Sequence, residues 1–188
     1  MTKTEGSELF RQALEAGSRR DYESAANILT RILSETDEVP EALLYLGRSL
    51  HSLGDFGKAI GAFRLYLRTS SARPEGWFFL GRTYLAASRP LESARCLRRA
   101  LELGADGAET WALLGLSALR LRKSKASVEA LERAVTLDPG NPRIFRGYLN
   151  ALFVHAVRTL NKGDPDMARQ MLSFVISNGL DGVAQRLW

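Results

Sequence analysis

The chain has 188 residues, of which 45% are apolar and 25% are charged, and these proportions are ordinary for a soluble folded protein. The net charge of +5 is too small for this length to indicate nucleic acid as the partner. A single cysteine, Cys96, excludes an internal disulfide, and no apolar run approaches the roughly 20 residues of a membrane span.

Residues 1–6 precede the first apolar periodicity and are expected to be a flexible N-terminus. The opening sequence MTKTEGSELFRQ lacks the apolar core of a secretion signal. We therefore expect a cytoplasmic location, or a soluble domain of a larger protein.

A period of 34 residues runs through the sequence that follows. Leu-Gly pairs recur with this spacing at Gly47, Gly81 and Gly115. Two other columns keep the same interval, a small residue at Ala59, Ser93 and Ser127 and a large apolar residue at Phe63, Leu97 and Leu131. A fixed period of this length is typical of a repeat array, in which each unit buries its apolar face on the next.

Each repeat is expected to be a pair of helices. All six prolines lie near inferred helix boundaries, where proline is tolerated, and no segment alternates apolar and polar residues as a half-buried strand does. The predicted fold class is therefore all-α, with about five helical hairpins. The expected array, 7–180, consists of repeats at about 7–39, 40–73, 74–107, 108–141 and 142–180.

The fifth repeat departs from the period. Ala168 follows Ser127 by 41 residues, seven more than the interval in the other repeats. We therefore expect the first helix of this repeat, roughly 142–162, to be about two turns longer than the others. Residues 181–188 are expected to form a short capping helix or the start of a truncated repeat.

The pattern W-x2-LG-x2-Y at 77–84 resembles the tetratricopeptide repeat. The stretches LGRSLHSLGDFGKAIGAF at 46–63 and ALERAVTLDPGNP at 130–142 resemble it as well, and the resemblance covers roughly 7–178. It implies a superhelix of stacked hairpins whose first helices line a concave surface. Such an array is mostly helix–helix interface, so we expect a non-catalytic interaction protein.

Helical spacing selects the side chains on that concave surface, because residues three and four apart share a face. They include Leu44, Tyr45, Arg48, Phe78, Phe79, Arg82, Leu85, Leu113, Leu116 and Leu119. The first repeat contributes Phe10, Arg11 and Leu14 to the same surface. An exposed apolar surface of this kind marks an interaction site, and arginine suits carboxylates. The expected partner is a protein or peptide segment that is apolar or amphipathic and partly acidic.

Two other occupants of this surface remain open. In an alternative hypothesis, the protein is a structural assembly module. Its groove or its long fifth-repeat helix then packs against a second copy, forming a homodimer, or against the rest of a larger protein. A chaperone C-terminal tail is not expected, because apolar residues such as Phe10, Leu14 and Tyr45 stand where the polar clamp known in the family would be.

The expected interior of the third repeat contains Trp77, Leu80 and Tyr84. Between them lies Gly81, which costs about 1 kcal/mol relative to alanine within a helix. We interpret it as a point where the two helices of one hairpin approach closely.

A basic edge is expected at the turn of the fourth repeat, formed by Arg120, Arg122, Lys123 and Lys125. It is interpreted either as a solvated rim or as a docking edge for an acidic partner, an anionic membrane or RNA. No aromatic residues interleave with these basic residues, so base stacking has little support.

Candidates for chemistry are few. His51 and His155 lack companion acids at ligand spacing, and no phosphate-binding glycine loop or nucleophile motif occurs. We expect no enzyme activity, no cofactor and no metal.

Overall fold

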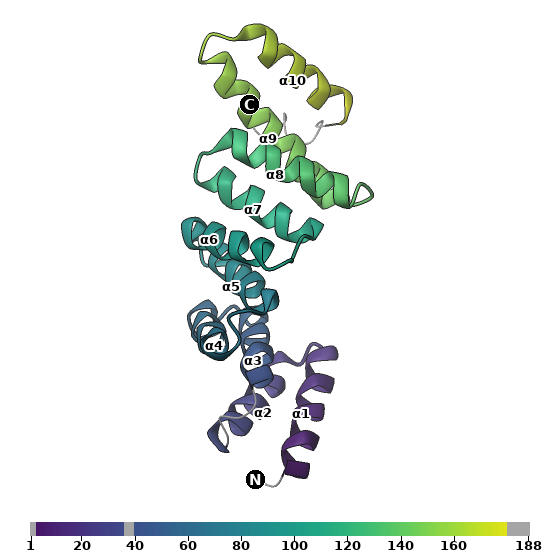
Figure 1. Cartoon of the computed structure of the whole chain (residues 1–188). Helices are drawn as coiled ribbons and strands as arrows, with labels where there is room; N and C mark the ends of the chain where they lie inside the picture. Colours follow the sequence, from purple (N-terminus) through teal and green to yellow (C-terminus); the bar gives the residue numbers. More distant parts are fainter. Residues whose placement is uncertain (1–2, 36–39, 180–188) are drawn as a thin grey trace. The chain divides into compact units, whose positions relative to one another are not determined.

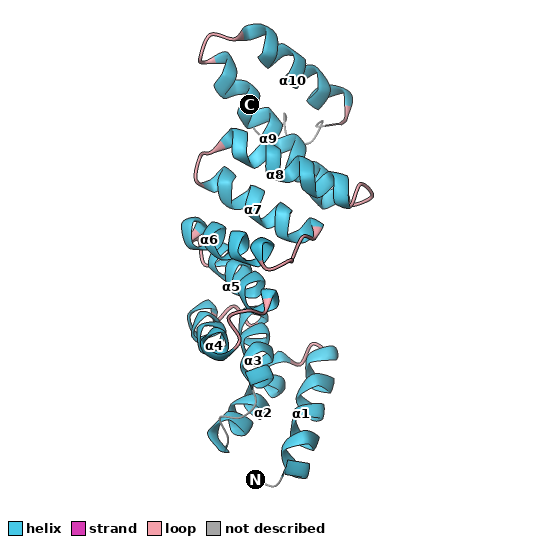
Figure 2. Cartoon of the chain, viewed as in Figure 1, coloured by secondary structure: helices cyan, strands magenta, loops and turns pink. Residues whose placement is uncertain are grey.

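The computed structural model describes residues 3–35 and 40–179, and this part of the chain contains ten α-helices and no strand (Figures 1 and 2). The helices are α1 (Lys3–Ser18), α2 (Tyr22–Glu35), α3 (Pro40–Ser52), α4 (Phe56–Thr69), α5 (Pro74–Ala86), α6 (Pro90–Glu102), α7 (Ala108–Arg120), α8 (Ser124–Leu137), α9 (Pro142–Leu160) and α10 (Pro165–Ser177). Each odd-numbered helix packs on the helix that follows it, which gives five hairpins. The predicted all-α fold is confirmed.

Two compact units divide the chain, Met1–Ala105 with α1 to α6 and Asp106–Trp188 with α7 to α10. In the first unit, each hairpin packs on the next through the pairs α2–α3 and α4–α5. In the second unit, α8 packs on α9 in the same way. Each unit therefore has its own apolar interior, built by stacking hairpins.

The residues of the 34-residue columns form these interiors. Phe63, Leu97 and Leu131 are at most 1% exposed, and so is Leu29, which occupies the same column one period earlier. The small residues that precede them allow the two helices of a hairpin to approach, because a larger side chain there would need space that the packed interior lacks. The period thus records which side of each helix is buried.

Gly81 lies at the close contact that the sequence predicted. A Cβ atom at this position would be 2.8 Å from Leu97 Cγ and 3.3 Å from Cys96 Cβ, both on α6. Gly47 and Gly115 make the same approach, with a Cβ atom 2.6 Å from Phe63 and Leu131 respectively. The glycine column is therefore a packing requirement of the hairpin.

Prolines begin several helices. Pro74, Pro90, Pro142 and Pro165 occupy the first turns of α5, α6, α9 and α10. A proline is tolerated there because the first N–H groups of a helix have no intrahelical acceptor.

The long helix of the fifth repeat is also confirmed. α9 has 19 residues, whereas α3, α5 and α7 each have 13, so α9 is about 9 Å longer at 1.5 Å per residue. Its length brings additional side chains to the end of α9 that is remote from Pro142. The helix predicted at 181–188 lies outside the described residues.

The first helix begins earlier than the sequence predicted. α1 starts at Lys3, so residues 3–6, expected to be part of a flexible N-terminus, are helical. No proline interrupts this stretch. Glu5 places a negative charge in the first turn, where its attraction to the positive end of the helix dipole stabilises the helix.

The apolar side chains around Gly81 are buried to different extents. Leu80 is 3% and Tyr84 8% exposed, in agreement with their expected interior positions. Trp77 packs against the same cluster but is only half-buried, and its indole N–H donates a hydrogen bond to the main-chain oxygen of Ser71 at 2.8 Å.

Candidate functional site

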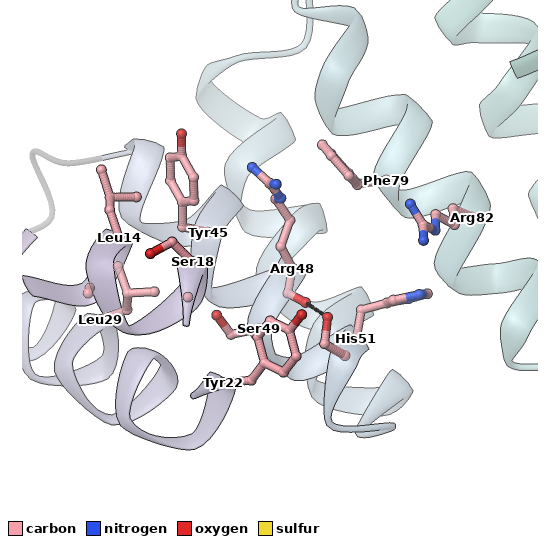
Figure 3. Close-up of a pocket in the computed structure, with 13 residues that line it drawn as sticks. Leu14, Ser18, Tyr22, Leu29, Tyr45, Arg48, Ser49, His51, Phe79 and Arg82 are labelled. Atoms are coloured by element: carbon pink, nitrogen blue, oxygen red, sulfur yellow. Dashed lines mark hydrogen bonds between the residues drawn. The ribbon is translucent and has the colours of Figure 1, made fainter. Parts of the chain in front are cut away.

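A cavity of about 550 Å³ lies in the first unit, between α1, α3 and α5 (Figure 3). We call it the α1–α3–α5 groove. It is lined by Ala13, Leu14, Gly17, Ser18, Tyr22, Leu29, Tyr45, Arg48, Ser49, His51, Ser52, Phe79 and Arg82. Most of these side chains are on first helices of hairpins, the helices that the sequence predicted to line a binding surface.

Arg48 lies between two aromatic rings in this groove (Figure 3). The central carbon of its guanidinium is 5.1 Å from the ring centre of Tyr45 and 5.0 Å from that of Phe79. A cation at this distance from a ring face is attracted by the negative π surface. The two rings therefore hold the charge of Arg48 in one place.

The rings that hold Arg48 are themselves packed. Phe79 stacks on Phe63 with ring centres 6.0 Å apart, and Phe78 meets Phe79 edge to face at 5.1 Å. Tyr45 meets Phe10 of α1 edge to face at 5.6 Å. Because these neighbours fix both rings, Arg48 is positioned before any partner binds.

The charges that line the groove are positive. Arg48 and Arg82 contribute guanidinium groups, and no lining residue is an aspartate or glutamate. Within residues 3–35 and 40–179, no carboxylate pairs with Arg48. A guanidinium is suited to two parallel hydrogen bonds with a carboxylate, so this group can bind an acidic ligand.

His51 connects α3 to α5 at one side of the groove. Its Nδ1 lies 3.0 Å from Thr83 Oγ1, and that hydroxyl donates to the main-chain oxygen of Phe79 at 2.7 Å. Since the single hydroxyl hydrogen is used by Phe79, Nδ1 of His51 must be the donor to Thr83. Burial lowers the pKa of His51, and the positive charge of Arg82 lowers it further, so the neutral imidazole is favoured.

Four of the predicted groove residues line this cavity: Tyr45, Arg48, Phe79 and Arg82. Leu44 packs partly buried against the core of the first unit instead, and Phe78 is half-buried beside Phe79.

The prediction that Leu85 lies on the binding surface is wrong. Leu85 is only 6% exposed, so it does not belong to a binding surface. The reason is the helical spacing from Gly81, because a residue four positions later lies on the same face of α5. That face approaches α6 closely, and Leu85 is enclosed with it.

Leu113, Leu116 and Leu119 lie on α7 in the second unit. Leu116 is 38% exposed, and the other two are half-buried.

The structure also brings residues of α1 into the groove, among them Leu14, which helical spacing places on the concave face of the first repeat. Leu14 is one period before Arg48, as Arg48 is before Arg82. Leu14 is 37% exposed and both arginines are exposed, so this column marks the open face of the first helices.

A second cavity, of about 570 Å³, lies in the second unit between the α7–α8 turn and the end of α9. We call it the basic pocket. It is lined by Arg122, Lys123, Ser124, Lys125, Ala126, Glu129, His155, Arg158, Thr159 and Lys162. Three residues of the predicted basic edge contribute to it, whereas Arg120 does not line it.

Neither a metal site nor a membrane-spanning helix is found in the described part of the chain. No group of histidine, cysteine, aspartate and glutamate side chains there is arranged to hold a metal ion. Among the described helices, none is both long and apolar enough for a bilayer crossing.

Comparisons with known proteins concern the fold. The family model of the tetratricopeptide repeat matches residues 10–74 and 80–142. No curated protein sequence matches the chain.

The similar solved structures include those of three proteins. MamA from Desulfovibrio magneticus RS-1 is 21% identical, with a TM-score of 0.73 over 92% of this chain and 94% of that one. YrrB, described as a TPR protein with an unusual peptide-binding site, is 18% identical, with a TM-score of 0.74 over 93% and 87%. A thermophilic TPR protein of Thermus thermophilus is 18% identical, with a TM-score of 0.64 over 97% and 95%. At these identities the similarity shows the fold alone.

Proposed function

The chain belongs to the tetratricopeptide repeat family, and on that premise we propose that it is a non-catalytic protein-interaction scaffold. Its α1–α3–α5 groove binds an apolar or amphipathic, partly acidic segment of a partner protein. The observation that carries this proposal is Arg48, held between Tyr45 and Phe79 in a cavity without an acidic lining residue.

The groove offers two kinds of contact to such a segment. Leu14 and the ring of Tyr45 provide apolar surface, which favours an aliphatic or aromatic side chain of the partner. Arg48 provides a fixed cation for a carboxylate next to it. A cavity of about 550 Å³ has the size of a small-ligand site and suits a few side chains of a short segment rather than a folded domain.

Preorganisation supports the same function. Arginine has high side-chain entropy, and ordering it on binding normally costs part of the interaction energy. The two rings already restrict Arg48 in the free protein. A carboxylate can therefore bind without ordering this side chain first.

The test is a selection of peptides from a random display library on the full chain, followed by affinity measurements on synthetic peptides. We expect selected peptides to combine an acidic residue with an aromatic or aliphatic one. Arg48→Gln should weaken their binding about tenfold or more, since a hydrogen bond to a charged group contributes roughly 1.5–3 kcal/mol.

The matched control is Arg31→Gln, which removes the same charge from the exposed face of α2. It should leave peptide affinity within about twofold, the change expected of a screened surface charge. Circular dichroism checks that both variants stay folded. Equal binding by Arg48→Gln and the parent chain would exclude the groove as the site.

A second candidate function is assembly through the fifth repeat. It is favoured by large apolar side chains of α9 and α10 that remain exposed. They are Val157, Leu160, Met167, Phe174 and Ile176. Apolar surface of this kind is typical of sites that pack on a second copy or on another part of a larger protein.

Sedimentation over a range of concentrations distinguishes the two functions. If assembly is the function, the mass rises with concentration, and Ile176→Glu, at a position 73% exposed, abolishes the rise. A constant monomer mass would remove the homodimer hypothesis and leave peptide binding unaffected.

A further inference from the structure

The basic pocket of the second unit combines residues from two distant parts of the sequence. Arg122, Lys123 and Lys125 come from the α7–α8 turn and the start of α8. Arg158 and Lys162 come from the end of α9 and the residues after it, a position that α9 reaches through its additional length. Five basic residues therefore surround one cavity.

Hydrogen bonds hold the two sides of the pocket together. The Arg158 guanidinium donates to the main-chain oxygen of Arg122. The Ser124 hydroxyl at the start of α8 lies 3.1 Å from Nδ1 of His155 on α9. These contacts fix the α8 start against α9, so the cations stay close to one another in the free protein.

The charges of the pocket are not balanced by its own acids. Glu129 is the one acidic lining residue, and it pairs with Lys125, with Nζ and Oε1 4.0 Å apart. Arg122, Lys123 and Lys162 face the same cavity without a carboxylate among its other lining residues. Holding like charges together is unfavourable, and a multiply charged anion between them would relieve that repulsion.

The charged residues of the basic pocket also affect His155. Its pKa is lowered by burial and further by the positive charges of Lys162, Lys125 and Arg158, while Glu129 opposes the shift. The neutral imidazole is therefore favoured, and its second nitrogen stays available as a hydrogen-bonding group.

We infer that the basic pocket binds a phosphate monoester carried on a side chain of a partner protein. Such a group bears nearly two negative charges and three acceptor oxygens near neutral pH, so it can interact with several of the cations that line the pocket at once. A single carboxylate would compensate the charge of only one of these cations. This site is separate from the α1–α3–α5 groove and does not depend on the function proposed for it.

Two other anionic partners fit the pocket less well. RNA recognition commonly stacks bases on aromatic rings, and no aromatic residue lines the pocket. A membrane surface presents its charges in a plane, whereas the cations here surround a cavity of about 570 Å³. A phosphorylated side chain can enter that cavity.

Arg122 supplies a selective variant. Its φ is +59°, in the left-handed region, and Gly54 and Gly163 hold the same conformation at the corresponding turns of other hairpins. Arg122→Gly therefore removes the charge with a residue that this backbone conformation favours. Lys162→Gln removes a second charge from the opposite side of the pocket.

The experiment titrates the full chain with a library of phosphoserine peptides and with the same peptides carrying serine or aspartate. Inorganic phosphate is titrated separately, with binding followed by NMR. We expect phosphopeptides to bind at least about tenfold more tightly than their serine forms, with shifted signals at Ser124, His155 and Thr159. The combined Arg122→Gly and Lys162→Gln variant should lose at least about tenfold.

The control is Arg169→Gln, which removes a positive charge from an exposed site on α10 outside the pocket. It should leave phosphopeptide affinity within about twofold. The groove variant Arg48→Gln should also leave it unchanged, so failure of the groove proposal and failure of this one give different results.

Four results would overturn the inference. One is equal affinity for phosphorylated and serine peptides, and another is an equal loss in the pocket variant and Arg169→Gln. The third is preferential binding to vesicles of phosphatidylcholine and phosphatidylserine or to single-stranded oligouridine, which would assign the pocket to a membrane or to RNA. Binding of inorganic phosphate alone, with no preference among peptides, would likewise exclude a protein partner.

Discussion

The hydroxyl of Ser127 on α8 donates a hydrogen bond to the main-chain oxygen of Gly115 on α7, at 2.8 Å. Ser127 is fully buried, and a Cβ atom at Gly115 would lie 3.2 Å from the Ser127 main-chain oxygen and 2.6 Å from Leu131 Cγ. The bond forms because the missing side chain of Gly115 lets the two helices approach. Close backbone packing and a buried polar contact therefore depend on each other in this hairpin.

Ser127→Ala should lower the free energy of unfolding by about 1 kcal/mol, the typical net contribution of one intramolecular hydrogen bond. Urea unfolding followed by circular dichroism measures the change. Thr136→Ala is the matched control on the same helix, because Thr136 is exposed and its hydroxyl bonds within its own helix, to the Glu132 oxygen. The control should change stability by less than about 0.5 kcal/mol; equal effects of the two substitutions would refute the role of the Ser127 bond.

Gly81→Ala should destabilise the first unit, although alanine is the better helix former. A Cβ atom 2.8 Å from Leu97 Cγ forces a shift in α6, and overpacking costs about 1–3 kcal/mol. Gly81→Leu should cost more because more volume must be accommodated.

The opposite result is expected for Gly61→Ala in α4. A Cβ atom at Gly61 meets nothing within 4 Å, and the substitution at this exposed position should stabilise the protein by about 0.4–1 kcal/mol. Thermal or urea unfolding of both variants measures the contrast. Stabilisation by both substitutions would show that Gly81 is not a packing requirement.

Stability should decline as the pH falls from 7 to 5 because of His51 and His155. In the folded state the pKa of each imidazole is lowered, chiefly by burial and further by neighbouring positive charges. The unfolded chain, with a histidine pKa of about 6.5, therefore binds protons first as the pH falls. The stabilisation is fully present above that pKa and is lost below it.

Urea unfolding at several pH values in this window measures the decline, and the double variant His51→Gln/His155→Gln should show a flatter profile. Carboxylates such as Glu92 also have a lowered pKa, but they lose their contribution only below the ordinary value of about 4.5. An unchanged slope in the double variant would contradict the assignment to histidine.

Cys96 should react slowly with thiol reagents in the folded protein. Burial raises the pKa of its thiol to about 11, with a smaller contribution from Glu92, and the residue is 7% exposed. Since the thiolate is the reactive form, modification by a disulfide reagent at pH 8 should be at least about a hundredfold slower than in urea. Rapid modification under native conditions would indicate frequent opening of the α5–α6 hairpin.

The fold class and the succession of hairpins could be predicted from the amino-acid sequence alone. Each repeat buries the same positions, so the columns of Gly81 and Leu97 recur at a fixed interval and can be read without coordinates. The seven-residue displacement of Ala168 revealed the long α9 for the same reason. Periodicity is visible in sequence because it arises from contacts that every repeat makes.

Which side chains meet could be learned only from the packing of the helices in three dimensions. Helical spacing placed Leu85 on the binding face, yet the close approach at Gly81 encloses it. The position of Arg48 between two rings depends on α3 and α5 packing together, and Arg158 reaches Arg122 from a distant helix. Spacing along one helix defines a face, whereas a binding site depends on the distances between faces of different helices, and those are set by packing.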